Sequence, residues 1–163
     1  MEVVDYAPEY AAAFEALNLE WLEKYFQVEE VDQIVLSDPQ AEVIDRGGHI
    51  LFVKVAGEVV GTVALKHQGA GLYELTKMAV TAGQQGQGLG RALLVAAIER
   101  FHSISGGILY LETNSSLGTA IRLYESAGFR HASHPGGSDY ARADTYMIYQ
   151  PDDKVLKSKE KEE

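Results

Sequence analysis

The strongest constraint on the fold of this chain is a glycine-rich stretch between two apolar runs. In "KMAVTAGQQGQGLGRALLVAAIER", residues 77–100, glycine alternates with other residues at Gly86, Gly88 and Gly90. Glycine is the poorest ordinary helix former, yet the run that follows it has the apolar content of a buried helix. The sequence therefore predicts a strand that passes through a glycine-rich turn into a helix over about residues 89–102, which should be well buried because its run Ala92 to Ile98 is apolar all round.

A turn of this kind is suited to binding an anion. A helix that starts after glycines leaves its first backbone N–H groups unpaired, and the helix dipole adds positive potential there. Glycines also lack the Cβ atoms that would keep a phosphate at a distance. We therefore predict that the loop from Gln85 to Gly90 binds a phosphate or pyrophosphate. The alternative is that the glycines only allow the helix to pack closely on the sheet.

Two familiar phosphate-binding motifs fit the loop poorly. A P-loop ends in Gly-Lys-Ser/Thr, whereas this loop ends in Gly90, Arg91 and Ala92. The dinucleotide fingerprint G-x-G-x-x-G is missed by one residue, although Glu112 ends the next predicted strand, where a ribose-binding acid could lie. The chain also lacks the remaining parallel strands of the dinucleotide fold. An NAD(P)-dependent oxidoreductase therefore stays the weaker alternative.

Apolar periodicity along the chain predicts one α/β domain over residues 1–150. The expected order is a strand, two helices, of which Asn18 could divide the first, a hairpin, a third strand, the helix after the glycines, and then a strand, a helix and one or two final strands. The segment from Leu72 to Thr113 is expected to be a parallel strand–helix–strand crossover. The expected elements are 2–4, 9–26, 32–39, 49–67, 71–80, 89–102, 106–113, 116–129 and 139–150. Residues 151–163 form a charged tail that we expect to be disordered.

Composition excludes several classes of function. The chain has 14 Lys and Arg against 24 Asp and Glu, a net charge of −10, which disfavours nucleic acid as a ligand. It has no cysteine, which removes disulfides, thiolate metal sites and a cysteine nucleophile. No apolar run is long enough to cross a bilayer and the N-terminus is not a secretory signal, so a cytoplasmic protein is expected. The histidines are expected at the surface, and "HASH" lacks an assured third ligand, so no metal is expected.

Two motifs together resemble the signature of a known enzyme family. Gln85-x-x-Gly88-x-Gly90, preceded by "MAV", and "AIRLYESAGF" at residues 120–129 are similar to motifs of the GNAT superfamily of acyl-CoA N-acyltransferases. The "ELTKMAV" and "LETNS" segments resemble a bacterial subgroup. The resemblance implies an α/β (α+β) fold with a mixed, mostly antiparallel central sheet and a parallel strand–helix–strand at the coenzyme cleft. It also implies acetyl-CoA as cosubstrate and an amine acceptor, and it allows a homodimer.

The resemblance assigns the coenzyme site to one strand and its following loop. Met78, Ala79 and Val80 lie where the pantetheine arm would pair like an extra strand. Many members carry an asparagine three residues before the alanine of the second motif; here that position is Leu117, so Asn114 is the substitute candidate, with Ser116 as an alternative. The backbone amides expected to hold the pyrophosphate are those of Gln85, Gly86, Gln87, Gly88, Leu89, Gly90 and Arg91.

Acyl transfer to an amine needs a base, an acid and a donor to the thioester oxygen. Glu74 matches the position of a catalytic glutamate in the family, and strand alternation predicts that it shares a face with Met78 and Val80. Burial there would raise its pKa, as a base for an ammonium requires; the alternatives are a Glu74–Lys77 pair or Glu112 as base. Tyr124 resembles the family's acid for the leaving thiolate, or is a core tyrosine with its hydroxyl satisfied.

The acceptor side carries the weakest signal. "YARADTY" is expected to place Tyr140, Arg142 and Asp144 on one strand face, where Arg142 could bind a substrate carboxylate or simply pair with Asp144. Trp21 and Arg46 are further candidates. The expected function is direct transfer of an acetyl group from acetyl-CoA to a primary amine of a small or amino-acid-like molecule. The alternatives are a peptide or protein lysine or N-terminus as acceptor, and a non-catalytic acyl-CoA-binding module.

Overall fold

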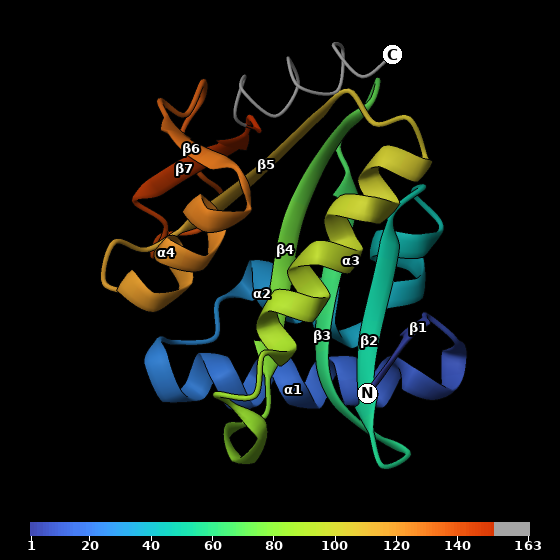
Figure 1. Ribbon diagram of the computed structural model, residues 1–163. Coiled ribbons are helices and arrows are strands. Elements are labelled where there is room, and N and C mark those ends of the chain that lie inside the picture. The colour runs from blue at the N-terminus through green and yellow to red at the C-terminus, as the bar shows by residue number, and fades with distance from the viewer. Residues whose placement is uncertain (152–163) are drawn as a thin grey trace, which may run out of the picture. The chain divides into compact units, whose positions relative to one another are not determined.

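The computed structural model describes residues 1–151 and contains two compact units (Figure 1). The first is Met1–Leu109, and the second begins at Tyr110. The predicted tail, apart from Pro151, lies outside the described residues. The single domain expected over residues 1–150 stays a prediction.

The first unit is built on an antiparallel sheet whose strands pair in chain order. Hydrophobic runs with β-branched residues form these strands, as expected from the sequence. The strands are β1 (Glu2–Asp5), β2 (His49–Val55), β3 (Glu58–His67) and β4 (Leu72–Val80).

Helices cover both faces of this sheet. On one face, Leu93 of helix α3 lies against Gly61. A Cβ atom built on Gly61 would lie 3.0 Å from Cδ1 of Leu93. On the other face, Ala64 belongs to a core cluster with Phe14 and Leu36 from the first two helices. In Figure 1, α3 runs along the strands on the near side of the sheet. The helices of this unit are η1 (Pro8–Tyr10), α1 (Ala11–Tyr25), α2 (Glu30–Ser37), the π-helical turn η2 (Gln40–Ile44), the short turn η3 (Ala82–Gln84) and α3 (Leu89–Ser103).

Asn18 does not divide the first helix, although the sequence allowed a division there. Its side chain is 2% exposed, and its Nδ2 atom donates a 3.0 Å hydrogen bond to the carbonyl oxygen of Phe14. The amide therefore bonds to the helix's own backbone instead of competing with it. As a result α1 is continuous from Ala11 to Tyr25.

Helix α3 is less completely buried than its apolar run predicts. Leu93, Leu94 and Ala97 are fully buried, but Val95, in the middle of the apolar run, is 43% exposed. A helix that lies on one face of a sheet can bury only the side that faces the strands. The apolar run Ala92–Ile98 therefore supplies both the packing face of α3 and part of its surface.

The second unit contains a smaller antiparallel arrangement in which β7 pairs with β5 on one side and β6 on the other. Strand β5 starts within the first unit, where the N–H groups of Gly107 and Ile108 donate to the Gly71 carbonyl at 2.8 and 3.1 Å. The starts of β4 and β5 thus lie side by side, as a crossover through α3 requires. The elements are β5 (Ile108–Thr113), α4 (Gly118–Ala127), β6 (Phe129–Ala132) and β7 (Thr145–Tyr149). The mixed α/β, mostly antiparallel fold class predicted from the sequence is confirmed.

The last strand is shorter than expected. Residues 139–142 form bends and turns, Ala143 and Asp144 are irregular, and strand geometry begins at Thr145. Asp144 explains the difference, since its N–H donates to the Thr113 carbonyl at 3.1 Å and its carboxylate accepts from the N–H and hydroxyl of Ser115. These bonds tie the segment to the end of β5. Tyr140, Arg142 and Asp144 therefore do not occupy alternate positions of a strand, and the predicted common face is wrong.

Gly128 ends α4 in the left-handed conformation that the sequence predicts, with φ of 111°. A Cβ atom there would lie 3.1 Å from Cε1 of Tyr149 and 3.3 Å from Cα of Pro151. We expect Gly128→Ala to lower the free energy of unfolding by about 1–3 kcal/mol, from left-handed strain and crowding. Urea unfolding measures it. Gly83→Ala is the matched control, because Gly83 has open space around it; equal losses in the two variants would contradict the expectation.

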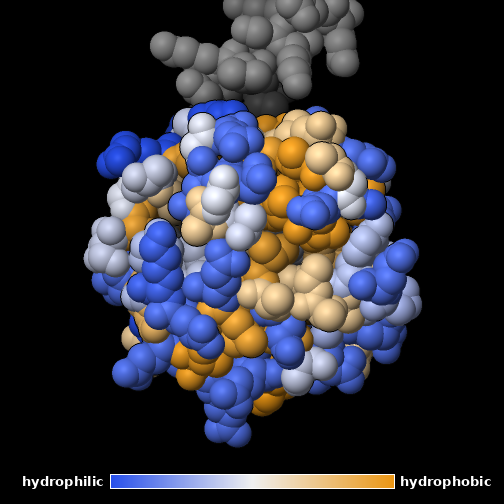
Figure 2. Space-filling view, turned by 90° about the horizontal axis from the view of Figure 1, so that it is seen from below, coloured by the Kyte–Doolittle hydropathy of each residue, from blue (hydrophilic) through white to orange (hydrophobic). Residues whose placement is uncertain are grey.

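Apolar residues also reach the surface. Seen from below, they form a band between hydrophilic residues (Figure 2). Within residues 1–151, no helix combines the length and the apolar character needed to cross a membrane.

Candidate active site

The glycine loop between β4 and α3 has an open, left-handed backbone. Gly86 and Gly88 have φ of 83° and 77°, a region that L-residues with side chains rarely adopt. A Cβ atom built on either glycine would meet no heavy atom of the described residues within 4 Å. The Nε2 atom of Gln85 donates a 3.1 Å hydrogen bond to the Val80 carbonyl, which ties the loop to the end of β4. The backbone of the loop is therefore accessible to a ligand and held at its base.

The N-terminus of α3 opens directly from this loop. The N-cap residue is Gly88, and within the described part of the chain no side chain caps the helix. The first helical hydrogen bond runs from the Ala92 N–H to the Gly88 carbonyl at 3.1 Å, so the N–H groups of Leu89 and Gly90 precede it. The first turn holds no acidic residue. Uncapped N–H groups and the dipole of a 15-residue helix make this end electrostatically favourable for an anion.

Helix α1 braces the start of the loop through Glu20, a residue that the sequence analysis did not single out. One Glu20 oxygen accepts from the hydroxyl of Thr81 at 3.0 Å and from the N–H of Ala82 at 2.9 Å. These contacts close the turn η3 that precedes the glycines. An exposed glutamate on a helix carries no local sequence signal for such a role, because its partners lie 61 and 62 residues away.

A β-bulge in β4 changes which faces its residues occupy. Ala64 pairs with Thr76 but Thr62 pairs with Ala79, so two residues of β4, Lys77 and Met78, lie opposite Val63 alone. Bulges add one residue to a strand and reverse the alternation beyond them.

The reversal corrects the predicted placement of Glu74. Glu74 pairs with Lys66, two residues from Ala64, and so lies on the sheet face covered by α1 and α2. Val80 pairs with Gly61. A Cβ atom built on Gly61 would lie near both Val80 and Leu93 of α3, so Val80 lies on the opposite face of the sheet from Glu74. The predicted common face of Glu74, Met78 and Val80 is therefore wrong, because the bulge lies between them.

Glu74 is nevertheless a buried carboxyl on the strand that leads to the loop. It is 4% exposed, and Gln68 Nε2 approaches its Oε1 atom at 3.5 Å. Lys77, the alternative partner considered from the sequence, forms a 3.0 Å ion pair with Asp32 of α2. Burial of a carboxyl favours its neutral form over the charged one.

Tyr124, the candidate acid, lies on α4 and is the buried residue of that helix, with 9% exposure. Its ring packs edge-on against Phe129 at a centroid distance of 6.0 Å. Burial raises the pKa of Tyr124 to about 12. The phenol therefore keeps its proton throughout the neutral pH range.

Asn114 is engaged within its own unit. Its Nδ2 atom donates to the Arg142 carbonyl at 2.6 Å, and its Oδ1 atom accepts from the Ser116 N–H at 2.9 Å. These bonds hold the turn after β5 against the loop before β7, and the coenzyme contact of Asn114 stays a prediction.

Two acceptor candidates, Trp21 and Arg46, belong to the first unit, and two, Tyr140 and Arg142, belong to the second. Trp21 packs against Tyr25 and Phe26 at centroid distances of 5.5 and 5.6 Å. Arg46 pairs with Glu42 on the same turn at 3.1 Å and is largely exposed. In the second unit, the guanidinium of Arg142 lies 4.8 Å from the ring centroid of Tyr140.

Glu112 forms a cluster with the loop between β6 and β7. Its carboxylate accepts a 2.7 Å hydrogen bond from the Ser138 hydroxyl and contacts Nε2 of His134. The Nδ1 atom of His134 accepts from the Gly136 N–H at 3.1 Å. His134 is thus a loop residue half-buried against β5, instead of the surface residue expected. Among residues 1–151, no group of three or more His, Asp or Glu could hold a metal ion.

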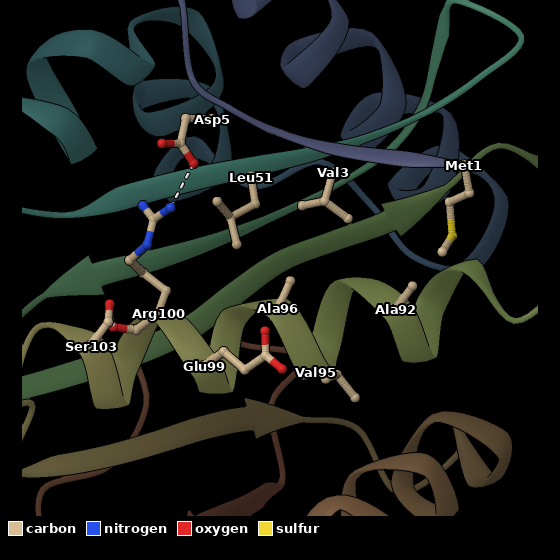
Figure 3. Close-up of a pocket in the computed structure, with 10 residues that line it drawn as sticks. All are labelled: Met1, Val3, Asp5, Leu51, Ala92, Val95, Ala96, Glu99, Arg100 and Ser103. Atoms are coloured by element: carbon tan, nitrogen blue, oxygen red, sulfur yellow. Dashed lines mark hydrogen bonds and ion pairs between the residues drawn. The ribbon is translucent and has the colours of Figure 1, made fainter.

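A separate groove lies between β1, β2 and α3. Figure 3 shows the apolar side chains of Leu51, Val3 and Val95 along it, and the 2.7 Å ion pair between Arg100 and Asp5 at one end. None of the described residues that line the groove is predicted to bind the coenzyme, to act in catalysis or to bind the acceptor. The groove is therefore distinct from the glycine loop.

Comparisons with known proteins agree with this geometry. The family model described as Acetyltransferase (GNAT) family matches residues 11–129. An uncharacterized N-acetyltransferase, YjgM, of Escherichia coli K12 is 34% identical over 104 residues, which are 61% of this chain. The chain spans only 62% of the length of that relative.

Solved structures share the fold. An acetyltransferase of the GNAT family from Staphylococcus aureus Mu50 has a TM-score of 0.79 at 19% identity, with 90% of this chain and 96% of that chain covered. The PaiA N-acetyltransferase from Thermoplasma acidophilum, solved in complex with coenzyme A, has a TM-score of 0.72 at 15% identity, with 91% and 98% covered. Because the family model covers most of the chain, the chain belongs to the acetyltransferase (GNAT) family.

Proposed function

We propose that this protein is an acetyl-CoA-dependent N-acetyltransferase that moves the acetyl group directly to a primary amine of a small or amino-acid-like molecule. The observation that carries the proposal is the glycine loop of a GNAT-family chain, with two left-handed glycines opening onto an uncapped helix N-terminus. Such a loop favours a pyrophosphate, and the PaiA relative was solved with coenzyme A.

In this proposal the backbone amides from Gln85 to Arg91 bind the pyrophosphate of the coenzyme. Residues Met78 to Val80, at the end of β4, pair with the pantetheine arm. Their neighbour Gln85 supports both parts, because its side chain bonds to the Val80 carbonyl where strand and loop meet.

The reaction forms a C–N bond, breaks a C–S bond and moves three protons. Glu74 accepts a proton from the acceptor's ammonium group, and the neutral amine nitrogen attacks the thioester carbonyl carbon. A backbone N–H of Met78 or Ala79 donates to the oxygen as negative charge develops there. The C–S bond then breaks, and Tyr124 gives its proton to the departing thiolate. The nitrogen that attacked carries a positive charge and passes its extra proton to water, from which the Tyr124 phenolate regains a proton. The absence of cysteine from the sequence excludes a cysteine-bound acyl intermediate.

The absence of cysteine also makes acetyl transfer simple to test. Because the chain has no cysteine, a thiol reagent detects only released coenzyme A. Acetyl-CoA is mixed with the protein and with amino acids, polyamines, aminoglycosides or short peptides, and thiol release is followed. Release with a small amine supports the proposal, while release with peptides alone points to a lysine or N-terminal acetyltransferase. A raised melting temperature with acetyl-CoA but no release would indicate a coenzyme-binding module, and stabilisation by NAD(P) alone would contradict the proposal.

Tyr124→Phe is expected to lower kcat by about 10- to 100-fold with little change in the KM for acetyl-CoA, because the variant keeps the ring and loses the proton donor. Steady-state rates on the best acceptor measure it. Tyr149→Phe is a matched control, since Tyr149 also packs against Phe129. Equal kcat in all three proteins would remove Tyr124 from the role of acid.

Tyr124→Phe also allows a test that does not depend on activity, through the pH dependence of the protein's stability. The folded-state pKa of Tyr124, about 12, lies above the ordinary value of 10.0, so the unfolded chain loses this proton first. The contribution of the neutral Tyr124 phenol to the free energy of unfolding is therefore complete below pH 10, and it is lost as the pH rises towards 12. Urea midpoints measured across this range should therefore fall less steeply for Tyr124→Phe than for the parent. Parallel declines would show that the phenol is not shielded from water.

A further inference from the structure

Lys77 occupies a backbone conformation that ordinarily favours glycine. Its φ is 56°, in the interior of β4 and at the bulge where Lys77 and Met78 together oppose Val63. A residue with a long side chain is strained in this region by contact between its Cβ atom and the following carbonyl. Such strain persists only where surrounding contacts hold it. Contacts of the Lys77 side chain are therefore expected to stabilise the bulge.

Those contacts include a buried ion pair with α2. The Nζ atom of Lys77 lies 3.0 Å from Oδ1 of Asp32, and the two side chains are 4% and 0% exposed. The other oxygen of Asp32 accepts a 2.9 Å hydrogen bond from the N–H of Glu29, in the capping box that starts α2. A buried charge is strongly disfavoured without its partner, so each residue holds the other in place. The pair connects the first turn of α2 to the bulge of β4.

We propose that Lys77 and Asp32 are positioning residues that hold the β4 bulge in its left-handed form and so set the direction of the Met78 and Ala79 amides. This inference rests on the proposed function, in which one of those amides donates to the thioester oxygen. Without the bulge, β4 pairs regularly with β3, and every residue after Thr76 shifts to the other face. The donor then points away from the position where negative charge develops.

Two double variants separate this role from simple stabilisation. Lys77→Met/Asp32→Asn removes both charges and leaves a residue that disfavours φ of 56°. Lys77→Gly/Asp32→Asn removes the same charges but supplies a residue that adopts the left-handed form without help. Neither variant contains an unpaired buried charge from the pair. Leu36→Ala is the control for loosened packing of α2, because Leu36 is a 2% exposed core residue of the same helix.

The expected result is a difference in kcat and not in coenzyme binding. The methionine variant should lose about 10- to 100-fold in kcat, with the KM for acetyl-CoA changed by less than about threefold, as expected for a misdirected oxyanion donor. The glycine variant should recover to within about fivefold of the parent, and the control should keep its kcat. A methionine variant with parental kcat would overturn the proposal, as would a glycine variant as slow as the methionine one.

A second readout does not depend on turnover. Amide NMR shifts of Val63, Ala79 and Val80 report the register between β3 and β4, and none of these residues is changed. They should move in the methionine variant and stay near parental values in the glycine variant. If the parent transfers no acetyl group to any acceptor, the proposed function fails, and this pattern of shifts still supports the positioning role. Parental shifts in the methionine variant would overturn it, whatever the activity.

Discussion

Gly88→Asp is expected to weaken the binding of acetyl-CoA by about 100-fold or more, the largest effect on coenzyme affinity anticipated for a single substitution in this protein. The new carboxylate would lie at the N-cap of α3, where the pyrophosphate is proposed to bind, and like charges brought together cost several kcal/mol. Each 1.4 kcal/mol corresponds to about tenfold in affinity. Aspartate is a preferred N-cap residue and tolerates the left-handed region better than most, so the helix itself should persist.

Gly88→Asn provides the matched control, because asparagine has nearly the same shape and no charge. We expect it to weaken binding much less than aspartate does. Isothermal titration with coenzyme A measures both variants, and circular dichroism checks that α3 is retained. Equal losses for the two variants would mean that the side chain's bulk, and not its charge, blocks the site. Unchanged affinity in both would place the coenzyme elsewhere.

Glu74→Gln is expected to lower kcat by about 100- to 10,000-fold, the range typical for removal of a general base. The loss should be greatest at low pH. An amine acceptor carries its proton there and needs a base, whereas at high pH a growing fraction of it is already neutral in solution. The residual rate of the variant should therefore rise with pH towards the pKa of the acceptor, and a pH profile of kcat measures this.

The control for Glu74 is Glu99→Gln, which makes the same chemical change at an exposed position of α3 in the separate groove. Its rates should stay within about twofold of the parent, because a distant surface charge has little influence at ordinary salt. If Glu74→Gln matched Glu99→Gln at every pH, Glu74 would not be the base. Because glutamine keeps the size of the side chain, melting temperatures near the parent's would exclude unfolding as the cause.

Local rules predicted most of the elements of this fold. Strand and helix periods placed β1 to β5, α3 and α4 to within a few residues, and the glycine pattern gave the turn before α3 because only glycine adopts positive φ without strain. Gly128 is an example, since a cap of this kind depends on the residue and its immediate neighbours. The same locality explains why family motifs centred on Gly88 and Tyr124 were enough to identify the fold class.

The errors occurred where distant parts of the chain decide a local outcome. The sequence allowed Asn18 to divide α1, but Asn18 is buried and bonds to its own helix. The segment from Tyr140 to Asp144 has the alternation of a strand, yet Asp144 is held by Thr113 and Ser115 at the end of β5. Asp144 and Ser115 are 29 positions apart in the sequence, and the hydrogen bonds between them prevent the strand that the local alternation predicts. Periodicity contains no information about such distant partners.

The sequence by itself therefore determined the element order, the family and the glycine-rich turn before α3, because each depends on residues that are neighbours along the chain. Only the tertiary structure decided the face of Glu74, since the bulge at Lys77 reverses the alternation of β4. It alone revealed the Asp32–Lys77 pair, whose members are 45 residues apart. A lysine in a strand shows no sign of positive φ, because that conformation is stabilised by a partner that only folding brings within 3.0 Å.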